Sequence, residues 1–243
     1  TENYASWNWK AGGAAVSNGD GTITSSVSAN PTAGFSIVSW TGDTNDPTIG
    51  HGLSSEIEMI IHKHRSGTVQ WNVYHKDAGT GGYLRIDGSQ AWASNAGFFG
   101  TAPTASVFSP GSHSYMDGSG NDNIAYCFHS VDGYSKVGSY TGNGNADGPM
   151  IFAGFRPAFF MVKNASTLGT DWRLYDDKRP AYNPVNLILY PDADYVESST
   201  SHPMDFVSNG IKNRGTFSEV NTSGDTYIYI AFAESPFKYS NAR

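Results

Sequence analysis

Hydrophobic and polar residues alternate with a period of two in many short segments of this chain. Ile57, Met59 and Ile61 take one side of one segment, and Trp71 and Val73 take one side of another. A period of two predicts β-strands, and such alternation is typical of antiparallel sheets with one covered and one wet face. Turn-forming Gly, Asn, Asp and Pro clusters return at roughly 10–15 residue intervals, and helical periodicity is missing. The pattern predicts an all-β protein built from jelly-roll-like β-sandwiches.

The chain contains an internal repeat with an offset of about 100 residues. GFSIVSWTG (34–42) recurs as GYSKVGSYTG (133–142), MIIHK (59–63) as FFMVK (159–163), YLRI (83–86) as LILY (187–190), VFSPGS (107–112) as DFVSNG (205–210), and IAYCFHS (124–130) as YIYIAFA (227–233). Trp71 and Tyr74 recur as Trp172 and Tyr175. The repeat predicts two tandem β-sandwich units, residues 34–131 and residues 132–243.

The first 33 residues are expected to form an N-terminal β segment that completes a preceding repeat. SWNWK (6–10) resembles the closing strand of each unit, with Trp9 in the place of Phe128 and Phe232. A hairpin is expected after it, with NGDG (18–21) supplying residues of positive φ. Because Thr1 is not an initiator residue, we expect the chain to be the C-terminal part of a longer protein.

Composition and charge exclude several classes of function. Charged residues make up 15% of the 243 residues, aromatic residues 14%, and the net charge is −7. The densest basic patch is His62–Arg65, which argues against a nucleic-acid partner and against anionic lipid. The longest apolar runs are strand-sized, so no membrane insertion is expected. The single cysteine, Cys127, excludes an internal disulfide framework and is expected to be a buried hydrophobic residue.

Four segments resemble a repeat region of marine tailed-phage virion proteins, which often forms the C-terminal part of tail-fibre-like proteins. They are NYASWNWKAGG (3–13), SYTGNGNADGP (139–149), GFRPAFFMVK (154–163) and YIYIAFAESPFKYSNAR (227–243). The resemblance covers nearly the whole chain. It implies a structural or host-contacting component of the virion surface, with other virion proteins and its own copies as partners, and a trimer if the protein belongs to a fibre. It transfers no functional residue.

Two groups of residues have the composition of metal ligands. Asn143, Asn145 and Asp147 reproduce the first half of a calcium loop, but Gly154 stands where the closing glutamate is needed. Since the same residue types form ordinary tight turns, plain turns are preferred and calcium is the alternative; no other cofactor is expected. His62 and His64 share one face of a strand, where a solvated face is preferred to a transition-metal site.

Aromatic residues in loops are candidates for stacking on sugar rings, because Tyr and Trp combine an apolar body with a polar tip. The candidates are Trp92, Phe98, Tyr115, Tyr182 and Tyr195. Trp71 and Trp172 occupy equivalent repeat positions and are expected to pack in the core.

Catalysis has little support in the sequence. Acidic pairs such as Asp171 and Glu197 could flank a glycosidic bond, but no nucleophile elbow, zinc-binding helix or phosphate-binding loop is present. Together with the resemblance to virion proteins, this predicts a non-enzymatic virion structural protein whose tandem β-sandwiches serve assembly. Adhesion to a bacterial surface, with a surface glycan as the partner, is expected as an additional role. A dedicated carbohydrate-binding module, a polysaccharide-degrading enzyme and a ligand-free particle decoration remain as alternatives.

Overall fold

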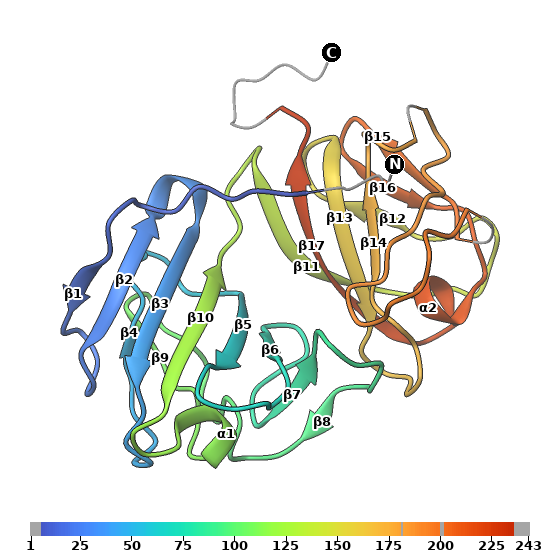
Figure 1. The fold of residues 1–243 in the computed structure, drawn as a ribbon. Helices are drawn as coiled ribbons and strands as arrows, with labels where there is room; N and C mark the ends of the chain where they lie inside the picture. The colour runs from blue at the N-terminus through green and yellow to red at the C-terminus, as the bar shows by residue number, and fades with distance from the viewer. Residues whose placement is uncertain (1–5, 181, 200–201, 236–243) are drawn as a thin grey trace.

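The computed structural model describes residues 6–180, 182–199 and 202–235, and it confirms an all-β protein with antiparallel sheets. Two units stand side by side, one built from the N-terminal half of the chain and one from the C-terminal half (Figure 1). Within the described ranges, no helix is both long and apolar enough to cross a membrane.

The first unit consists of a large sheet faced by a small one. The large sheet has eight strands in the order β1-β2-β3-β10-β5-β6-β7-β8, and the small sheet pairs β4 with β9. The elements are β1 (Val16–Asn18), β2 (Ser25–Asn30), the short 3-10 helix Pro31–Ala33, β3 (Phe35–Thr41), β4 (Ile49–Gly50), β5 (Met59–His64), β6 (Asn72–His75), β7 (Gly82–Arg85), β8 (Ala93–Ser94), β9 (Val107–Phe108), α1 (Ser114–Asp117) and β10 (Asp122–Phe128). Ile60, Tyr74 and Phe108 belong to the core of this unit, and Cys127 is buried there as expected.

The second unit is a sandwich of a four-stranded and a three-stranded sheet. Their strand orders are β11-β17-β13-β14 and β12-β16-β15. The elements are β11 (Ser135–Thr141), β12 (Met150–Phe152), β13 (Pro157–Asn164), β14 (Arg173–Asp176), β15 (Met204–Val207), β16 (Gly210–Asn213), α2 (Ser218–Asn221) and β17 (Thr226–Ala233). Phe160, Tyr175 and Phe206 are fully buried in the core.

Four strands of each large sheet correspond in order and register. The order β3-β10-β5-β6 of the first unit matches β11-β17-β13-β14 of the second. Phe128 pairs with Met59 in the first unit, and Phe232 pairs with Phe159 in the second. At this register Trp71 and Trp172 take equivalent places just before β6 and β14.

The two units pack against each other through the outer faces of their large sheets. Phe35 and Phe128 of the first unit share one apolar cluster with Phe159 and Phe232 of the second. The prediction of one wet face per sheet is therefore wrong over this area. Alternation of residue types shows only that the two faces of a strand differ. It does not show whether the outer face is covered by water or by a second protein surface. In β5, Met59 and Ile61 face the other unit, whereas Ile60 faces the core of the first unit.

The N-terminal segment joins the two units. Trp7 and Trp9 lie in the apolar cluster between them, and the Trp9 ring is 5.3 Å from that of Phe232. Residues 6–10 do not form the predicted strand, and residues 1–5 lie outside the described part. The chain then crosses to the first unit (Figure 1). There the predicted hairpin forms from β1 and β2, without positive φ in NGDG. Because β2 pairs with β3, the hairpin belongs to the first unit and not to a preceding repeat.

Candidate functional site

The outer face of the eight-stranded sheet changes from apolar to polar along its strands. Phe35, Ile37, Ser39 and Thr41 point to the same side of β3, because side chains two residues apart share a face. Phe35 and Ile37 pack in the cluster between the units. Ser39 is only partly buried and Thr41 is exposed. The second unit therefore covers one half of this face and leaves the other half open.

Cross-strand pairing arranges the open half into two polar rows. Ser26 pairs with Ser17 of β1 and with Ser39 of β3, which gives a row of three hydroxyl groups. In the next row, Thr41 pairs with Asp122 of β10, and the backbone N–H of Arg65 donates to the Asp122 carbonyl at 2.7 Å. Directly paired residues on one face are close enough to act together.

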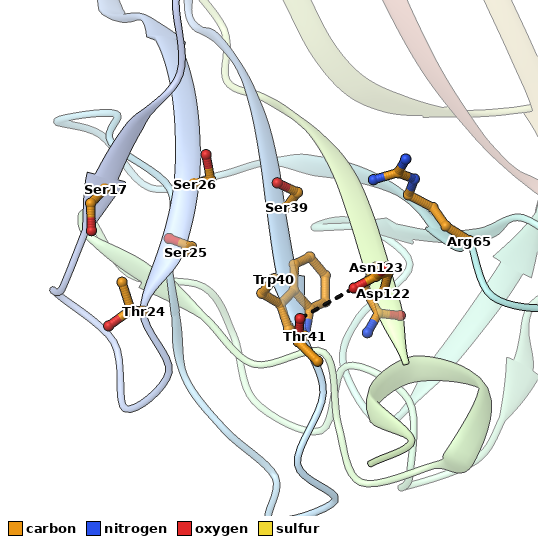
Figure 2. Close-up of a pocket in the computed structure, with 10 residues that line it drawn as sticks. All are labelled: Ser17, Thr24, Ser25, Ser26, Ser39, Trp40, Thr41, Arg65, Asp122 and Asn123. Atoms are coloured by element: carbon orange, nitrogen blue, oxygen red, sulfur yellow. Dashed lines mark hydrogen bonds between the residues drawn. The ribbon is translucent and has the colours of Figure 1, made fainter. Parts of the chain in front are cut away.

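These rows line a pocket of about 390 Å³, which we call the polar trough (Figure 2). Its lining consists of Ser17, Thr24, Ser25, Ser26, Ser39, Trp40, Thr41, Arg65, Asp122 and Asn123. Figure 2 shows Ser17, Ser26 and Ser39 on three neighbouring strands, with Asp122 and Arg65 at the other end of the trough. The trough thus offers hydroxyl groups, one carboxylate and one guanidinium group on a rigid sheet.

The two charged groups of the trough do not neutralise each other. The Thr41 hydroxyl donates to the Asp122 carboxylate at 3.2 Å, and the Asp122 backbone N–H donates to the Ser66 hydroxyl at 2.9 Å. No ion pair joins Arg65 to any described carboxylate. The Asp122 carboxylate therefore keeps acceptor capacity, and the Arg65 guanidinium keeps its donors.

An aromatic pair stands on the same face, next to the trough. The rings of Trp71 and Tyr126 are stacked, with centroids 6.3 Å apart and planes at 23°. The Lys63 ammonium lies 5.7 Å from the Trp71 ring centroid and also donates to the Val69 carbonyl. Trp71 is only partly buried, so its predicted place in the core is wrong. It presents a partly exposed amphipathic ring on the same sheet face, two strands away from the hydroxyl rows.

The reverse side of these strands is buried and holds the trough in place. His62 bonds through its Nε2 to the Asn123 side-chain oxygen at 3.1 Å, and its ring lies 5.5 Å from that of Trp40. Burial lowers the pKa of His62 to about 3, so this imidazole is neutral near pH 7. Since His62 and His64 are both buried, the predicted solvated histidine face is wrong. No cluster of three metal-ligating side chains occurs within the described ranges.

The aromatic residues predicted to stack on sugars are dispersed. Phe98 is 2% exposed and lies between Tyr83 and His113, at 4.3 and 4.5 Å, so it cannot present its face to a ligand. Trp92 is half-buried between the units and donates its backbone N–H to the Ala165 carbonyl at 2.9 Å. A Cβ atom at Gly82 would lie 2.3 Å from the Trp92 ring, so this glycine permits the packing.

The remaining three predicted aromatics are exposed but do not form one site. Tyr115, Tyr182 and Tyr195 expose 43%, 85% and 60% of their surface. Tyr115 lies in α1 of the first unit, where it contacts His113, whereas the other two lie in the loop between β14 and β15. Within the described ranges, no ring contact joins these three residues.

The candidate calcium residues form a hydrogen-bonded turn. The Asn143 side-chain oxygen accepts the Asn145 backbone N–H at 2.9 Å and the Asn221 amide at 3.1 Å. Asp147 forms an ion pair of 2.7 Å with Lys212, which lowers the pKa of its carboxyl group. The first unit has the same arrangement, in which Asp117 accepts the backbone N–H groups of Asp43 and Thr44. These hydrogen bonds explain why Asn143, Asn145 and Asp147 occur here: their side chains stabilise a turn.

Sequence reasoning missed the trough, although a signal was present. Ser26 on one strand, and Ser39 and Thr41 on the next, stand next to the buried residues Val27, Val38 and Trp40. Such a run of small polar side chains on one face indicates an open polar surface. The cross-strand register that unites it with Asp122 and Arg65, more than 20 residues away, is decided by tertiary pairing.

Fold and site together define an all-β protein of two packed antiparallel units, with an open polar trough on the first. The family described as "Domain of unknown function (DUF7483)" matches residues 1–236, and the chain belongs to this family. Comparison with curated proteins gave no match. Comparison with solved structures gave none either.

Proposed function

We propose that this protein is a non-enzymatic component of a virion surface that binds a bacterial surface glycan in the polar trough. The observation that carries the proposal is the combination of hydroxyl rows, an available carboxylate and guanidinium group, and a partly exposed tryptophan on one open sheet face. The five aromatic residues expected from the sequence are replaced in this role by Trp71 and Tyr126.

The chemistry of the trough matches that of a sugar. Asp122 accepts hydrogen bonds from sugar hydroxyl groups, while Arg65 and the serine hydroxyls donate to ring and hydroxyl oxygens. Trp71 offers the apolar surface on which the C–H face of a pyranose stacks. The volume of about 390 Å³ falls in the range of small-molecule sites, enough for a short oligosaccharide segment. Strands fix the backbone that carries the serine and threonine hydroxyls, so these short side chains lose little entropy on binding.

A binding role is favoured over hydrolysis by the count of carboxylates in the trough. Its lining includes one carboxylate, that of Asp122. Glycosidases use two, separated by about 5–10 Å across the scissile bond.

The packing of the two units suits a particle-surface role. A single apolar cluster joins both large sheets and the N-terminal tryptophans, which makes the pair a rigid spacer. The resemblance to tail-fibre-like proteins supports placement on a virion, with other virion proteins and further copies of the chain as partners. Antibody labelling of purified particles, viewed by electron microscopy, tests this placement.

A glycan array with matched variants tests the binding function. We expect the wild-type protein to bind a defined set of bacterial glycans, and Trp71→Ala and Asp122→Ala each to reduce binding at least about tenfold. Tyr182→Ala, in an exposed loop of the second unit, is the control and should bind like wild type. An array with no bound glycan would overturn the proposal and leave a ligand-free decoration. Binding lost equally in Tyr182→Ala would overturn the assignment of the binding site to the trough.

A further inference from the structure

We infer that the polar trough selects a glycan bearing carboxylate groups, with Arg65 as the residue that recognises them. This inference rests on the glycan-binding function proposed above and names its ligand class. It starts from the pairing state of the arginines.

Arg65 differs from the other described arginines in having no partner for its guanidinium group. Arg156, Arg173, Arg179 and Arg214 form ion pairs with carboxylates, and Arg85 bonds to the Tyr83 hydroxyl. The contact of Arg65 within the described part of the chain is made by its backbone. In a chain with net charge −7, an arginine left without a carboxylate is available for an external anion.

The position of Arg65 directs its charge into the trough. It is exposed and lines the pocket, and Figure 2 shows its side chain reaching toward the strand that carries Asp122 and Asn123. The Asp122 carboxylate is turned toward Thr41 instead, along the dashed line. A planar guanidinium group binds a carboxylate through two parallel hydrogen bonds, so Arg65 can hold a uronic acid carboxylate while Asp122 receives hydroxyl groups.

Lys63 adds a second positive charge on the same face. Lys63 and Arg65 are two residues apart at the end of β5 and share a face. The Lys63 ammonium donates to Val69 and lies over Trp71, and its further N–H groups remain for a ligand. Arg65 and Lys63 outnumber the one carboxylate of the trough, that of Asp122, while the Asp87 carboxylate lies farther along the sheet at the Trp71 backbone N–H. Such a local excess of positive charge favours an anionic ligand.

Polygalacturonate and its fully methyl-esterified form are the probes, because they share one backbone and differ in carboxylate charge. We expect wild-type protein to bind the acid form at least about tenfold more tightly, with an affinity that falls as sodium chloride is added. Arg65→Gln should weaken binding of the acid form about tenfold and binding of the ester less than about threefold. Arg65→Lys should bind the acid form with an affinity between those of the wild type and Arg65→Gln.

The control variant is Lys178→Gln, which removes one positive charge from a side chain that is 78% exposed in the second unit. It should bind both polymers like wild type. Equal affinity for acid and ester, with both lost in Trp71→Ala, would overturn the acidic-ligand inference and leave glycan binding intact. A glycan array on which the protein binds only neutral glycans would also overturn the acidic-ligand inference and leave glycan binding intact. If the protein binds neither polymer and no glycan on the array, both the acidic-ligand inference and the proposed glycan-binding function are overturned.

Discussion

The indole Nε1 of Trp172 donates a hydrogen bond of 2.7 Å to the backbone carbonyl of Arg85, across the boundary between the two units. Trp71 holds the equivalent place in the first unit, yet its ring stays partly exposed beside the polar trough. In both units a carboxylate, Asp87 or Asp192, accepts the backbone N–H of this tryptophan. The same hydrogen bond from the tryptophan backbone to a carboxylate therefore occurs at an interface in the second unit and at an open face in the first.

The two tryptophans should therefore differ in what they contribute: Trp172 mainly to stability and Trp71 mainly to glycan binding. Trp172 is 1% exposed, so Trp172→Ala should lower the free energy of unfolding by about 3–5 kcal/mol. Trp71→Ala should cost less than half as much and should remove glycan binding. Urea unfolding and glycan binding measured on both variants check this. Equal losses of stability in the two variants would contradict the distinction.

Phe232 couples the two units. Its ring lies 5.3 Å from Trp9, 6.2 Å from Phe128 and 5.8 Å from Phe159. Phe232→Ala should destabilise the protein by about 3–5 kcal/mol and broaden calorimetric unfolding, because the units lose their common cluster. The control is Phe152→Ala, whose side chain is 66% exposed and should change stability by less than about 0.5 kcal/mol. A single sharp transition at the wild-type temperature in Phe232→Ala would oppose this coupling.

Buried histidines should make the protein sensitive to mild acid. Burial lowers the pKa of His62 to about 3 and lowers that of His75 as well, from an ordinary value of 6.5. Between these values the unfolded chain binds protons that the folded protein does not, so stability is full above pH 6.5 and falls as pH decreases. Each such proton contributes about 1.4 kcal/mol per pH unit.

Unfolding by urea between pH 7.5 and pH 5.5 measures this slope, a window that lies above the ordinary pKa of 4.5 of the Glu58 and Glu219 carboxyl groups. His62→Gln, whose amide can still donate to Asn123, should reduce the slope by roughly one proton. Parallel pH profiles for wild type and His62→Gln would show that His62 does not titrate on unfolding.

Asn221 should be the main support of the loop that resembles a calcium site. Its amide donates to Asn143, Asn145 and Gly215, and its side-chain oxygen accepts the Asn143 backbone N–H. Asn221→Ala leaves several of these groups unsatisfied and should cost about 2–4 kcal/mol. Chelator should move the melting temperature of wild type by less than about 1 °C, because no bound metal is needed to order the turn. A larger shift would restore the calcium alternative.

The sequence by itself determined the class of this protein and the local structure of its strands. Period-two alternation and clusters of turn residues follow from backbone geometry within a few residues, so the β-strands, the β1–β2 hairpin and the buried Cys127 were predictable. The matching spacing of Trp71 and Trp172 also follows from local order, and it correctly pointed to equivalent places in the two large sheets.

Only the tertiary structure decided what each face of those strands meets. Alternation marks two faces but carries no information about what covers them, so Trp71 was assigned to the core. The trough joins Ser26, Ser39 and Asp122 through cross-strand register, a long-range relationship set by packing of the whole sheet. The second unit covers only part of that sheet, so Trp71 stays partly exposed and Arg65 exposed, whereas Trp172 of the second unit is buried against the first unit.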